Sequence, residues 1–291
     1  MRYGAIDIGT NSCRLLIAEV NAENEFNLLY KELETTRMGE GISQSNLLKE
    51  EAIERTLLCL NRFREKMQHY NVDKYRAIAT SAVREAGNGA QFVGQARYLS
   101  QVEVNIVGGE EEARLSYLGV KRGLKLTMSP LVVDLGGGST EFICPDEDML
   151  ISVPLGAVRA TEADMYAVQI SQVLTPIARV KERFKNRPLV MVGGTATTLV
   201  AVKKGLDEYN ADLVHGEILS RTEIGDLYNL MERMPLSLRR RMPGLQPERA
   251  DIINKGALIM LMIVDALGKS EVVVSESELL QGVVWSLAGE N

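Results

Sequence analysis

Carboxylate, glycine and hydroxyl residues occur together in two short stretches, residues 7–14 and 134–141. Each stretch begins with an aspartate, Asp7 or Asp134, directly after an apolar run, and the second ends in Glu141. Glycine turns let main-chain N–H groups converge on an anion, and carboxylate oxygens are the ligands that Mg²⁺ or its bound waters use. The alternative is an ordinary glycine-rich hairpin with solvated carboxylates, because short motifs have many false positives.

A second copy of the pattern favours the phosphate interpretation. The same number of residues separates Asp7 from Asp134 and Ser12 from Ser139. A repeat this long indicates two related domains rather than a solenoid, whose repeats are much shorter. Two such turns facing each other across a cleft would hold a chain of phosphates from both sides.

Three further positions carry residues suited to phosphate chemistry. Residues 110–112 are glutamates at a predicted helix start. The helix macrodipole explains the presence of at least two of these glutamates, and one of the three could deprotonate an attacking water. Arg84 follows a predicted strand, and its planar guanidinium suits phosphate oxygens; an ion pair with a neighbour is the alternative. Gly194 and Thr195 begin a helix after a buried strand, which is either an anion site or a packing turn.

Predicted strands and helices place these residues at strand ends and helix starts. Apolar runs predict strand–turn–strand units at residues 4–17 and 131–144, and strands at 26–34, 76–80, 102–107, 149–153, 188–192 and 271–275. Helical spacing predicts helices at 52–63, at 110–120, at 249–258 and at 279–287, and further helices beginning at 81 and 194. The amphipathic helix at 52–63 is expected to cover one face of a sheet.

Length and charge exclude several classes of protein. A chain of 291 residues is long for one domain and comfortable for two, and 45% hydrophobic residues can fill sizeable cores. The formal charge of −6 disfavours a protein that coats nucleic acid, so an anionic substrate needs local cations or a metal. Basic clusters at 121–125, 181–187, 203–204 and 239–241 are either solvated faces or the path of a long polyanion.

Cysteine usage and the apolar runs of the sequence indicate the cellular compartment in which the protein works. The three cysteines are scattered without a CxxC pair, and the two histidines are far apart, which argues against a disulfide framework and a zinc cluster. No export signal is apparent, and the apolar run at 257–264 is too short to span a bilayer. We therefore expect a soluble cytoplasmic protein with no membrane partner.

Five ordered motifs, at residues 6–12, 79–86, 111–113, 134–141 and 193–199, give the chain a family resemblance over nearly its whole length. It resembles the exopolyphosphatase and guanosine pentaphosphate phosphatase family. The resemblance implies an α/β, two-lobed fold like that of actin, sugar kinases and heat-shock ATPases, which is ribonuclease H-like. The implied fold has duplicated mixed sheets with helices, and an interdomain cleft that holds the active site. The expected lobes are 1–122 and 123–291, and a terminal helix at about 277–291 is expected to pack back on the first.

The resemblance also implies roles for individual residues. Glu112 occupies the position of the catalytic base. Asp7, Asp134 and Glu141 match carboxylates that organise Mg²⁺ and water. The residues expected to contact phosphate are Thr10, Asn11, Ser12, Arg14, Arg84, Gly136, Gly137, Gly138, Ser139, Thr140, Gly194 and Thr195.

Family members remove the terminal phosphate from inorganic polyphosphate or guanosine pentaphosphate with Mg²⁺, so we expect metal-assisted, in-line attack by water. Two other functions are considered: a kinase or ATPase of the same superfamily, and a regulator that binds guanosine tetra- or pentaphosphate with little turnover. The protein is also a candidate to form a homodimer. Relatives often have Gly-Leu-Arg-Glu-Gly where this chain has Glu278, Leu279, Leu280, Gln281 and Gly282, and we expect altered helix packing there rather than lost chemistry. Longer relatives add helical C-terminal domains that extend the polyphosphate path, whereas this sequence stops after the expected two-lobed core, so we expect less processive action on long polymers.

Overall fold

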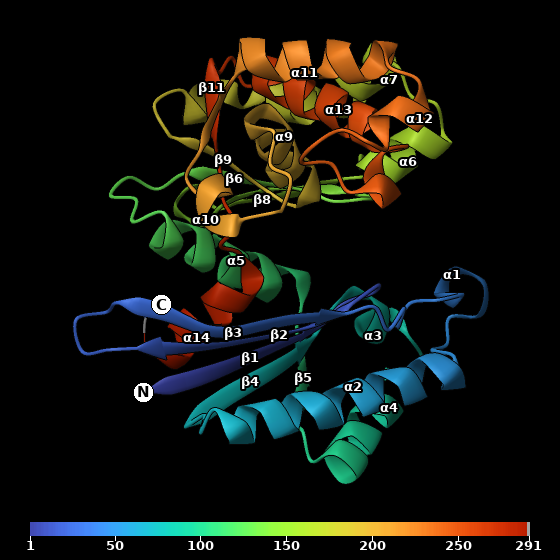
Figure 1. Ribbon diagram of the computed structural model, residues 1–291, viewed down its shortest axis with the longest axis vertical. Coiled ribbons are helices and arrows are strands. Elements are labelled where there is room, and N and C mark those ends of the chain that lie inside the picture. Colours follow the sequence, from blue (N-terminus) through green and yellow to red (C-terminus); the bar gives the residue numbers. More distant parts are fainter. Residues whose placement is uncertain (290–291) are drawn as a thin grey trace. The chain divides into compact units, whose positions relative to one another are not determined.

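A computed structural model describes residues 1–289 of the protein, apart from the side chains of Ser43 and Gln44. Residues 290 and 291, which belong to the expected terminal segment, lie outside the described residues. The chain forms two compact units (Figure 1). Unit 1 comprises Met1–Gly119 and the chain from Glu278 onward, and unit 2 comprises Val120–Ser277. The division at Gly119 lies slightly before the expected one at residue 122.

Unit 1 is built on a five-stranded sheet in the order β3-β2-β1-β4-β5. The first three strands are antiparallel neighbours, whereas β4 and β5 run parallel to β1. The strands are β1 (Arg2–Ile8), β2 (Cys13–Val20), β3 (Phe26–Glu34), β4 (Lys74–Ala79) and β5 (Val104–Ile106). The helices are α1 (Ile42–Ser45), α2 (Glu50–His69), α3 (Ser81–Glu85), α4 (Gly89–Gln95), a π-helical turn (Ala96–Ser100), α5 (Gly109–Gly123) and α14 (Leu279–Leu287).

The two faces of this sheet enter two separate cores, because alternate residues of a strand point to opposite sides. On one face, Ile6 and Leu15 belong to a core that includes the apolar side of α2. On the other face, Ala5 and Leu16 belong to a core that includes Leu280 and other residues of α14. Strand β1 is therefore buried along almost its whole length.

Two glycines let α14 lie against α5 within unit 1. A Cβ atom at Gly282 would lie 1.7 Å from the carbonyl oxygen of Leu115, and one at Gly119 would lie 2.0 Å from that of Glu278. Only glycine tolerates backbone contact this close. Leu280, one of the three departures from the family motif, is buried in the same core.

Unit 2 is built on a six-stranded sheet in the order β10-β11-β9-β6-β7-β8. The strands are β6 (Leu131–Leu135), β7 (Thr140–Cys144), β8 (Met149–Val153), β9 (Leu189–Val192), β10 (Ile218–Ser220) and β11 (Glu271–Val274). The helices are α6 (Ala157–Glu162), α7 (Ala167–Val173), α8 (Thr175–Arg179), α9 (Gly194–Lys204), α10 (Ala211–Val214), α11 (Arg221–Arg233), α12 (Leu236–Arg239) and α13 (Ile253–Ala266). Short 3₁₀ turns occur at Pro145–Glu147, Lys181–Phe184 and Pro247–Arg249.

The two sheets repeat one topology. The order β8-β7-β6-β9-β11 in unit 2 matches β3-β2-β1-β4-β5 in unit 1, with the same alternation of antiparallel and parallel neighbours. Unit 2 adds β10, which is antiparallel to β11. The expected α/β class with duplicated mixed sheets is thus confirmed.

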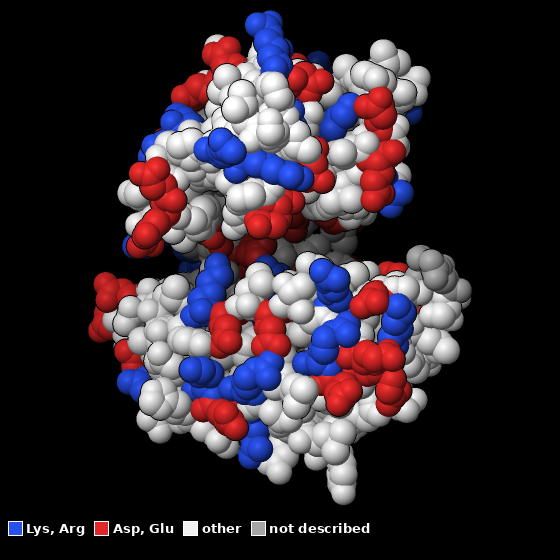
Figure 2. Space-filling view, turned by 45° about the vertical axis from the view of Figure 1, so that its right-hand side comes forward, with Lys and Arg blue, Asp and Glu red and all other residues white. Residues whose placement is uncertain are grey.

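The apolar run at 257–264 lies in α13, which is largely buried in the core of unit 2. No helix among the described residues is long and apolar enough to cross a membrane. On the face shown in Figure 2, acidic and basic side chains are interspersed over both units. Ion pairs between described residues include that of Arg55 with Glu40 at 3.1 Å.

Candidate active site

Each unit presents one carboxylate–glycine hairpin of the same geometry. In the first hairpin (residues 7–14), the Gly9 N–H donates to the Ser12 carbonyl at 3.0 Å. In the second hairpin (residues 134–141), the Gly136 N–H donates to the Ser139 carbonyl, also at 3.0 Å. The residues flanking the two turns differ: Asp7 stands opposite Arg14, whereas Asp134 stands opposite Glu141.

The turn of the first hairpin is fixed through its carbonyl groups. The N–H of Arg37 donates to the Asn11 carbonyl at 2.9 Å, and the N–H of Gly39 donates to the Thr10 carbonyl at 2.8 Å. A Cβ atom at Gly39 would lie 2.4 Å from the Thr10 side chain, so glycine is needed for this approach. The side chains of Thr10 and Asn11 are exposed, and that of Ser12 is partly exposed, as phosphate contact requires.

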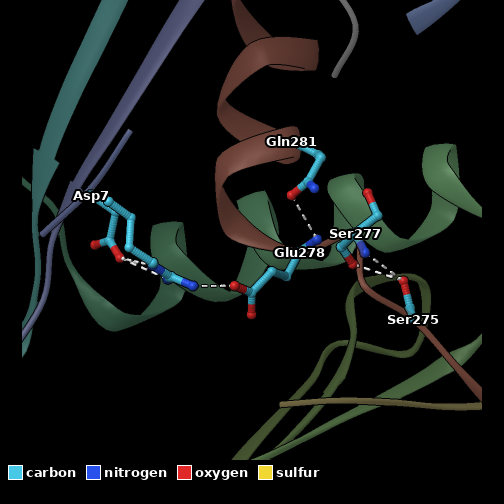
Figure 3. Close-up of polar contacts among 6 residues, drawn as sticks. Asp7, Ser275, Ser277, Glu278 and Gln281 are labelled. Carbon is cyan, nitrogen blue, oxygen red and sulfur yellow. Dashed lines mark hydrogen bonds and ion pairs between the residues drawn. The ribbon is translucent and has the colours of Figure 1, made fainter. Parts of the chain in front are cut away.

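Arg14 is held between two carboxylates in unit 1. Its Nε and Nη2 atoms donate to Oδ2 of Asp7 at 2.9 and 2.7 Å, and its Nη1 donates to Oε1 of Glu278 (Figure 3). Burial raises the pKa of the Asp7 carboxyl, and Arg14 opposes that shift. Burial alone would lower the pKa of the Arg14 guanidinium, but Glu278 and Asp7 outweigh it and raise that pKa above its ordinary value.

The three glutamates of α5 have different partners. Glu110 pairs with Arg114 at 2.9 Å, and Glu111 pairs with Arg76 at 2.5 Å. Glu112 instead accepts a hydrogen bond from Nη1 of Arg84 at 3.2 Å, and the same nitrogen donates to the Val107 carbonyl at 2.9 Å. The structure therefore brings together two predicted site residues, Glu112 and Arg84, whose side chains are about one-third exposed (31% and 32%).

Two carboxylates face each other across the second hairpin. Asp134 of β6 and Glu141 of β7 are direct cross-strand partners, so their side chains emerge on the same face of the sheet. Ser152 of β8 donates to Oε1 of Glu141 at 2.8 Å. Oδ1 of Asp134 lies only 3.2 Å from where a Cβ atom of Gly193 would stand, so the carboxylate lies against the turn between β9 and α9.

The glycine turn of the second hairpin packs on the start of α6. The Gly136 carbonyl accepts the N–H of Ala157 at 3.0 Å, and the Gly137 carbonyl accepts that of Val158 at 2.9 Å. A Cβ atom at Gly156 would lie 2.3 Å from the Gly137 carbonyl carbon. This backbone contact fixes the turn, while the glycines at 137 and 138 remain exposed.

Two arginines that the sequence analysis did not single out lie at the glycine turns of unit 2. Nε of Arg159 donates to the Gly138 carbonyl at 2.7 Å. Nη1 of Arg249 lies 1.6 Å from the position of a Cβ atom on Gly194, so its guanidinium covers the first residue of α9. No local motif marks either arginine, because both reach the turns from elements elsewhere in the sequence.

Two of the residues expected to contact phosphate, Thr140 and Thr195, have buried side chains. The Thr140 side chain is fully buried and donates to the Leu155 carbonyl, which ties β7 to the segment before α6. The Thr195 side chain is 5% exposed and packs against Gly256 of α13. Because the Thr195 side chain is buried, a phosphate contact there would involve its backbone N–H at the helix start, as the sequence predicts.

The carboxylates of the second hairpin are placed where they could hold a cation such as Mg²⁺. Like charges directly opposite on adjacent strands are destabilising, and a cation between Asp134 and Glu141 would relieve that repulsion. Asp7 contributes differently, since its Oδ2 is paired with Arg14 while its Oδ1 is buried without a hydrogen-bond partner in the described chain. Among residues 1–289, no group of three or more His, Cys, Asp or Glu side chains is clustered.

The model of the Ppx/GppA phosphatase family matches residues 16–291 of the sequence. The chain belongs to this family. Exopolyphosphatase 2 of Mycobacterium tuberculosis is a similar Ppx/GppA relative, 33% identical over 320 residues that cover 99% of each protein. A bifunctional 3-dehydroquinate synthase/phosphatase of Fusobacterium nucleatum is 35% identical over 305 residues, which cover 96% of this chain and 46% of that protein. The chain thus spans about half the length of the second relative.

Solved structures of Ppx/GppA proteins share the fold. A family member from Aquifex aeolicus superposes with a TM-score of 0.88 at 28% identity, covering 99% of this chain and 97% of that one. An exopolyphosphatase-like protein gives a TM-score of 0.77 at 29% identity, covering 98% and 97%. These likenesses confirm the family expectation drawn from the five motifs.

Proposed function

We propose that this protein is a phosphohydrolase that releases terminal phosphate from inorganic polyphosphate, guanosine pentaphosphate or both, with Mg²⁺. The observation that carries the proposal is the pair of opposed carboxylates, Asp134 and Glu141, beside an exposed glycine turn. Such a pair calls for a cation, and Mg²⁺ in proteins commonly completes its coordination with substrate phosphates. Membership of a phosphatase family and likeness to an exopolyphosphatase support this reading.

The two hairpins have different roles in the proposed reaction. Arg14 and the exposed turn residues of the first hairpin contact phosphate oxygens. Asp134 and Glu141 hold Mg²⁺, which when bound neutralises phosphate charge and orients water. Gly137, Gly138 and the start of α9 offer backbone N–H groups, and Arg159 and Arg249 add positive charge at those two turns.

Glu112 is the proposed general base. Its carboxylate takes a proton from water as the water oxygen forms a bond to the terminal phosphorus. The bridging P–O bond breaks, and the shortened polyphosphate leaves with the electron pair. Arg84 donates to the carboxylate at 3.2 Å and so orients it, while its other N–H groups are available to a phosphate.

The test is phosphate release from polyphosphates of graded length and from guanosine pentaphosphate, each with and without Mg²⁺. Glu112→Gln is expected to lower kcat by about 10²–10⁴-fold, because the amide cannot accept the proton. Glu110→Gln is the matched control, since Glu110 lies in the same helical turn but pairs with Arg114 on the exposed surface.

Two outcomes would refute the proposal in different ways. Equal kcat in Glu112→Gln and the wild type would remove Glu112 as the base. Tight guanosine pentaphosphate binding without phosphate release from any substrate would instead favour a nucleotide-binding regulator.

A further inference from the structure

Each of the three guanidinium nitrogens of Arg14 contacts a carboxylate of unit 1. Two of its nitrogens contact Oδ2 of Asp7, and the third contacts Oε1 of Glu278. Figure 3 shows the Asp7 and Glu278 carboxylates joined through these contacts. A substrate phosphate that binds Arg14 must therefore displace or share one of the two carboxylates.

Asp7 alone is sufficient to orient Arg14. It stands directly opposite Arg14 on the neighbouring strand, and its side chain is only 4% exposed. Its Oδ2 receives both the Nε and Nη2 contacts, which fixes the plane of the guanidinium. Glu278 takes only the remaining Nη1 edge. Orientation of the arginine thus gives no reason for the second carboxylate.

The backbone of Glu278 is held firmly in place beside the first hairpin. Its N–H donates to Oε1 of Gln281 at 3.1 Å, and its carbonyl accepts the N–H of Gly282 at 3.0 Å. The adjacent Leu279 is buried in the core beneath the sheet. These contacts fix the backbone position from which the Glu278 carboxylate reaches Arg14.

The charge of this group opposes phosphate binding. Asp7 and Glu278 each carry a negative charge and Arg14 one positive charge, so the three side chains together are anionic. The side chains of Arg14 and Glu278 are 24% and 25% exposed, whereas Asp7 is buried, so Glu278 rather than Asp7 is the carboxylate that an incoming anion meets.

We propose that Glu278 competes with phosphate for the Nη1 edge of Arg14 and thereby weakens binding of small phosphate anions to the first hairpin. This inference rests on the proposed phosphohydrolase function. A polyanionic chain, held at several points, overcomes the competition more readily than orthophosphate, which is the product. Glu278 would thus favour the release of orthophosphate over that of the remaining chain.

The test measures inhibition by inorganic phosphate during polyphosphate hydrolysis by the full chain. Glu278→Gln removes the charge but keeps the shape, and it is expected to lower the Ki for phosphate by about fivefold, as for a partly exposed ion pair. The KM for polyphosphate is expected to fall less than that Ki. Glu278→Ser is a second variant, because serine can still cap α14 but cannot reach Arg14.

Two further variants test whether Glu278 changes the Ki for phosphate by acting on Arg14. In the Arg14→Gln background, adding Glu278→Gln is expected to leave the Ki for phosphate unchanged. Glu19→Gln removes an equal charge from the same strand as Arg14, at a residue paired with Arg2 at 3.6 Å, and it is expected to leave the Ki at the wild-type value.

The outcomes separate this inference from the proposed function. Active Glu278→Gln and Glu278→Ser enzymes with unchanged or higher Ki for phosphate would overturn the competition and make Glu278 a support for Arg14. A similar fall in Ki in the Arg14→Gln background would overturn the route through Arg14. A folded wild type without phosphate release would overturn the proposed function, and this inference with it.

Discussion

Replacing Glu141 with glutamine is expected to stabilise the metal-free protein while it impairs hydrolysis. The change removes one of two carboxylates that face each other across the second hairpin. Glutamine keeps the shape of the side chain, and its amide oxygen can still accept the Ser152 hydroxyl that lies 2.8 Å from Oε1 of Glu141. The main loss is therefore one negative charge beside Asp134.

The size of the stability gain follows from the strand geometry. Direct cross-strand partners have Cβ atoms about 5 Å apart, and such charged pairs contribute about 0.2–1 kcal/mol. Both carboxylates are only partly buried, so solvent screening keeps the repulsion at about 0.5–1 kcal/mol. For a unit of this size, that free energy raises the midpoint of thermal unfolding by roughly 1–3 °C.

The assay is thermal unfolding of wild type and Glu141→Gln, without Mg²⁺ and with saturating Mg²⁺ and tripolyphosphate. Bound ligands stabilise the wild type by about 2.7 kcal/mol at a concentration 100 times the Kd. The Glu141→Gln variant is expected to have a higher unfolding midpoint than the wild type without ligands. Its midpoint is expected to rise less when the ligands are added, and it is expected to hydrolyse polyphosphate more slowly.

Glu147→Gln is a control that is expected to change the unfolding midpoint in the opposite direction. Glu147 pairs with Arg187 and Arg183, and its hydrogen bond with Arg187 is the main cause of its lowered pKa. Its removal is expected to lower the midpoint and leave the ligand response intact. A Glu141→Gln midpoint below that of the metal-free wild type would refute the repulsion on which the metal assignment depends.

Two other predictions concern unit 2. Gly194→Ala places a methyl group 1.6 Å from Nη1 of Arg249 and pushes that guanidinium off α9, so the KM for polyphosphate is expected to rise about tenfold. Gly225→Ala, where a Cβ atom meets nothing within 4 Å, is the control, and equal KM values would remove Arg249 from the site. The pKa of Glu223 is lowered from its ordinary 4.5 to about 2, first by the backbone N–H of Ser220 and then by Lys203 and the Ser220 hydroxyl. The stability that the ionised Glu223 contributes to the folded protein is therefore complete above pH 4.5 and is lost as the pH falls towards 2. Glu223→Ala is expected to unfold about 1 kcal/mol more easily at pH 7, with the difference from wild type vanishing near pH 2, and a constant difference in unfolding midpoint across that range would contradict the assignment.

Much of the fold follows from local patterns in the sequence. Both hairpins were predictable because a glycine turn between apolar runs permits few other structures. Strand β10 was missed because it has only three residues at the edge of its sheet, and four-residue helices such as α12 leave no periodic signal. The sequence offers no signal for the division between the units because α5 runs through it without a break.

The candidate site was only partly predictable, because some of its contacts depend on tertiary packing. Glu112 could not be separated from Glu110 and Glu111 by charge or periodicity, and the family resemblance made that choice. Arg249 reaches α9 only because Gly194 has no side chain. The contact between Arg14 and Glu278 joins positions 264 residues apart, so no local pattern predicts it. These remaining site roles stay predictions until the variants are measured.

The docking of α14 has a consequence for synthesis of the protein. Leu280 and Val283 of α14 complete a core with Tyr3 and Leu16, which belong to the first strands to leave the ribosome. All of unit 2 is translated between these segments. At roughly 5–20 residues per second, the sheet of unit 1 waits on the order of tens of seconds for its last helix. During that interval its apolar face is open to chaperones and to misfolding, so unit 2 can finish folding before the unit that was begun first.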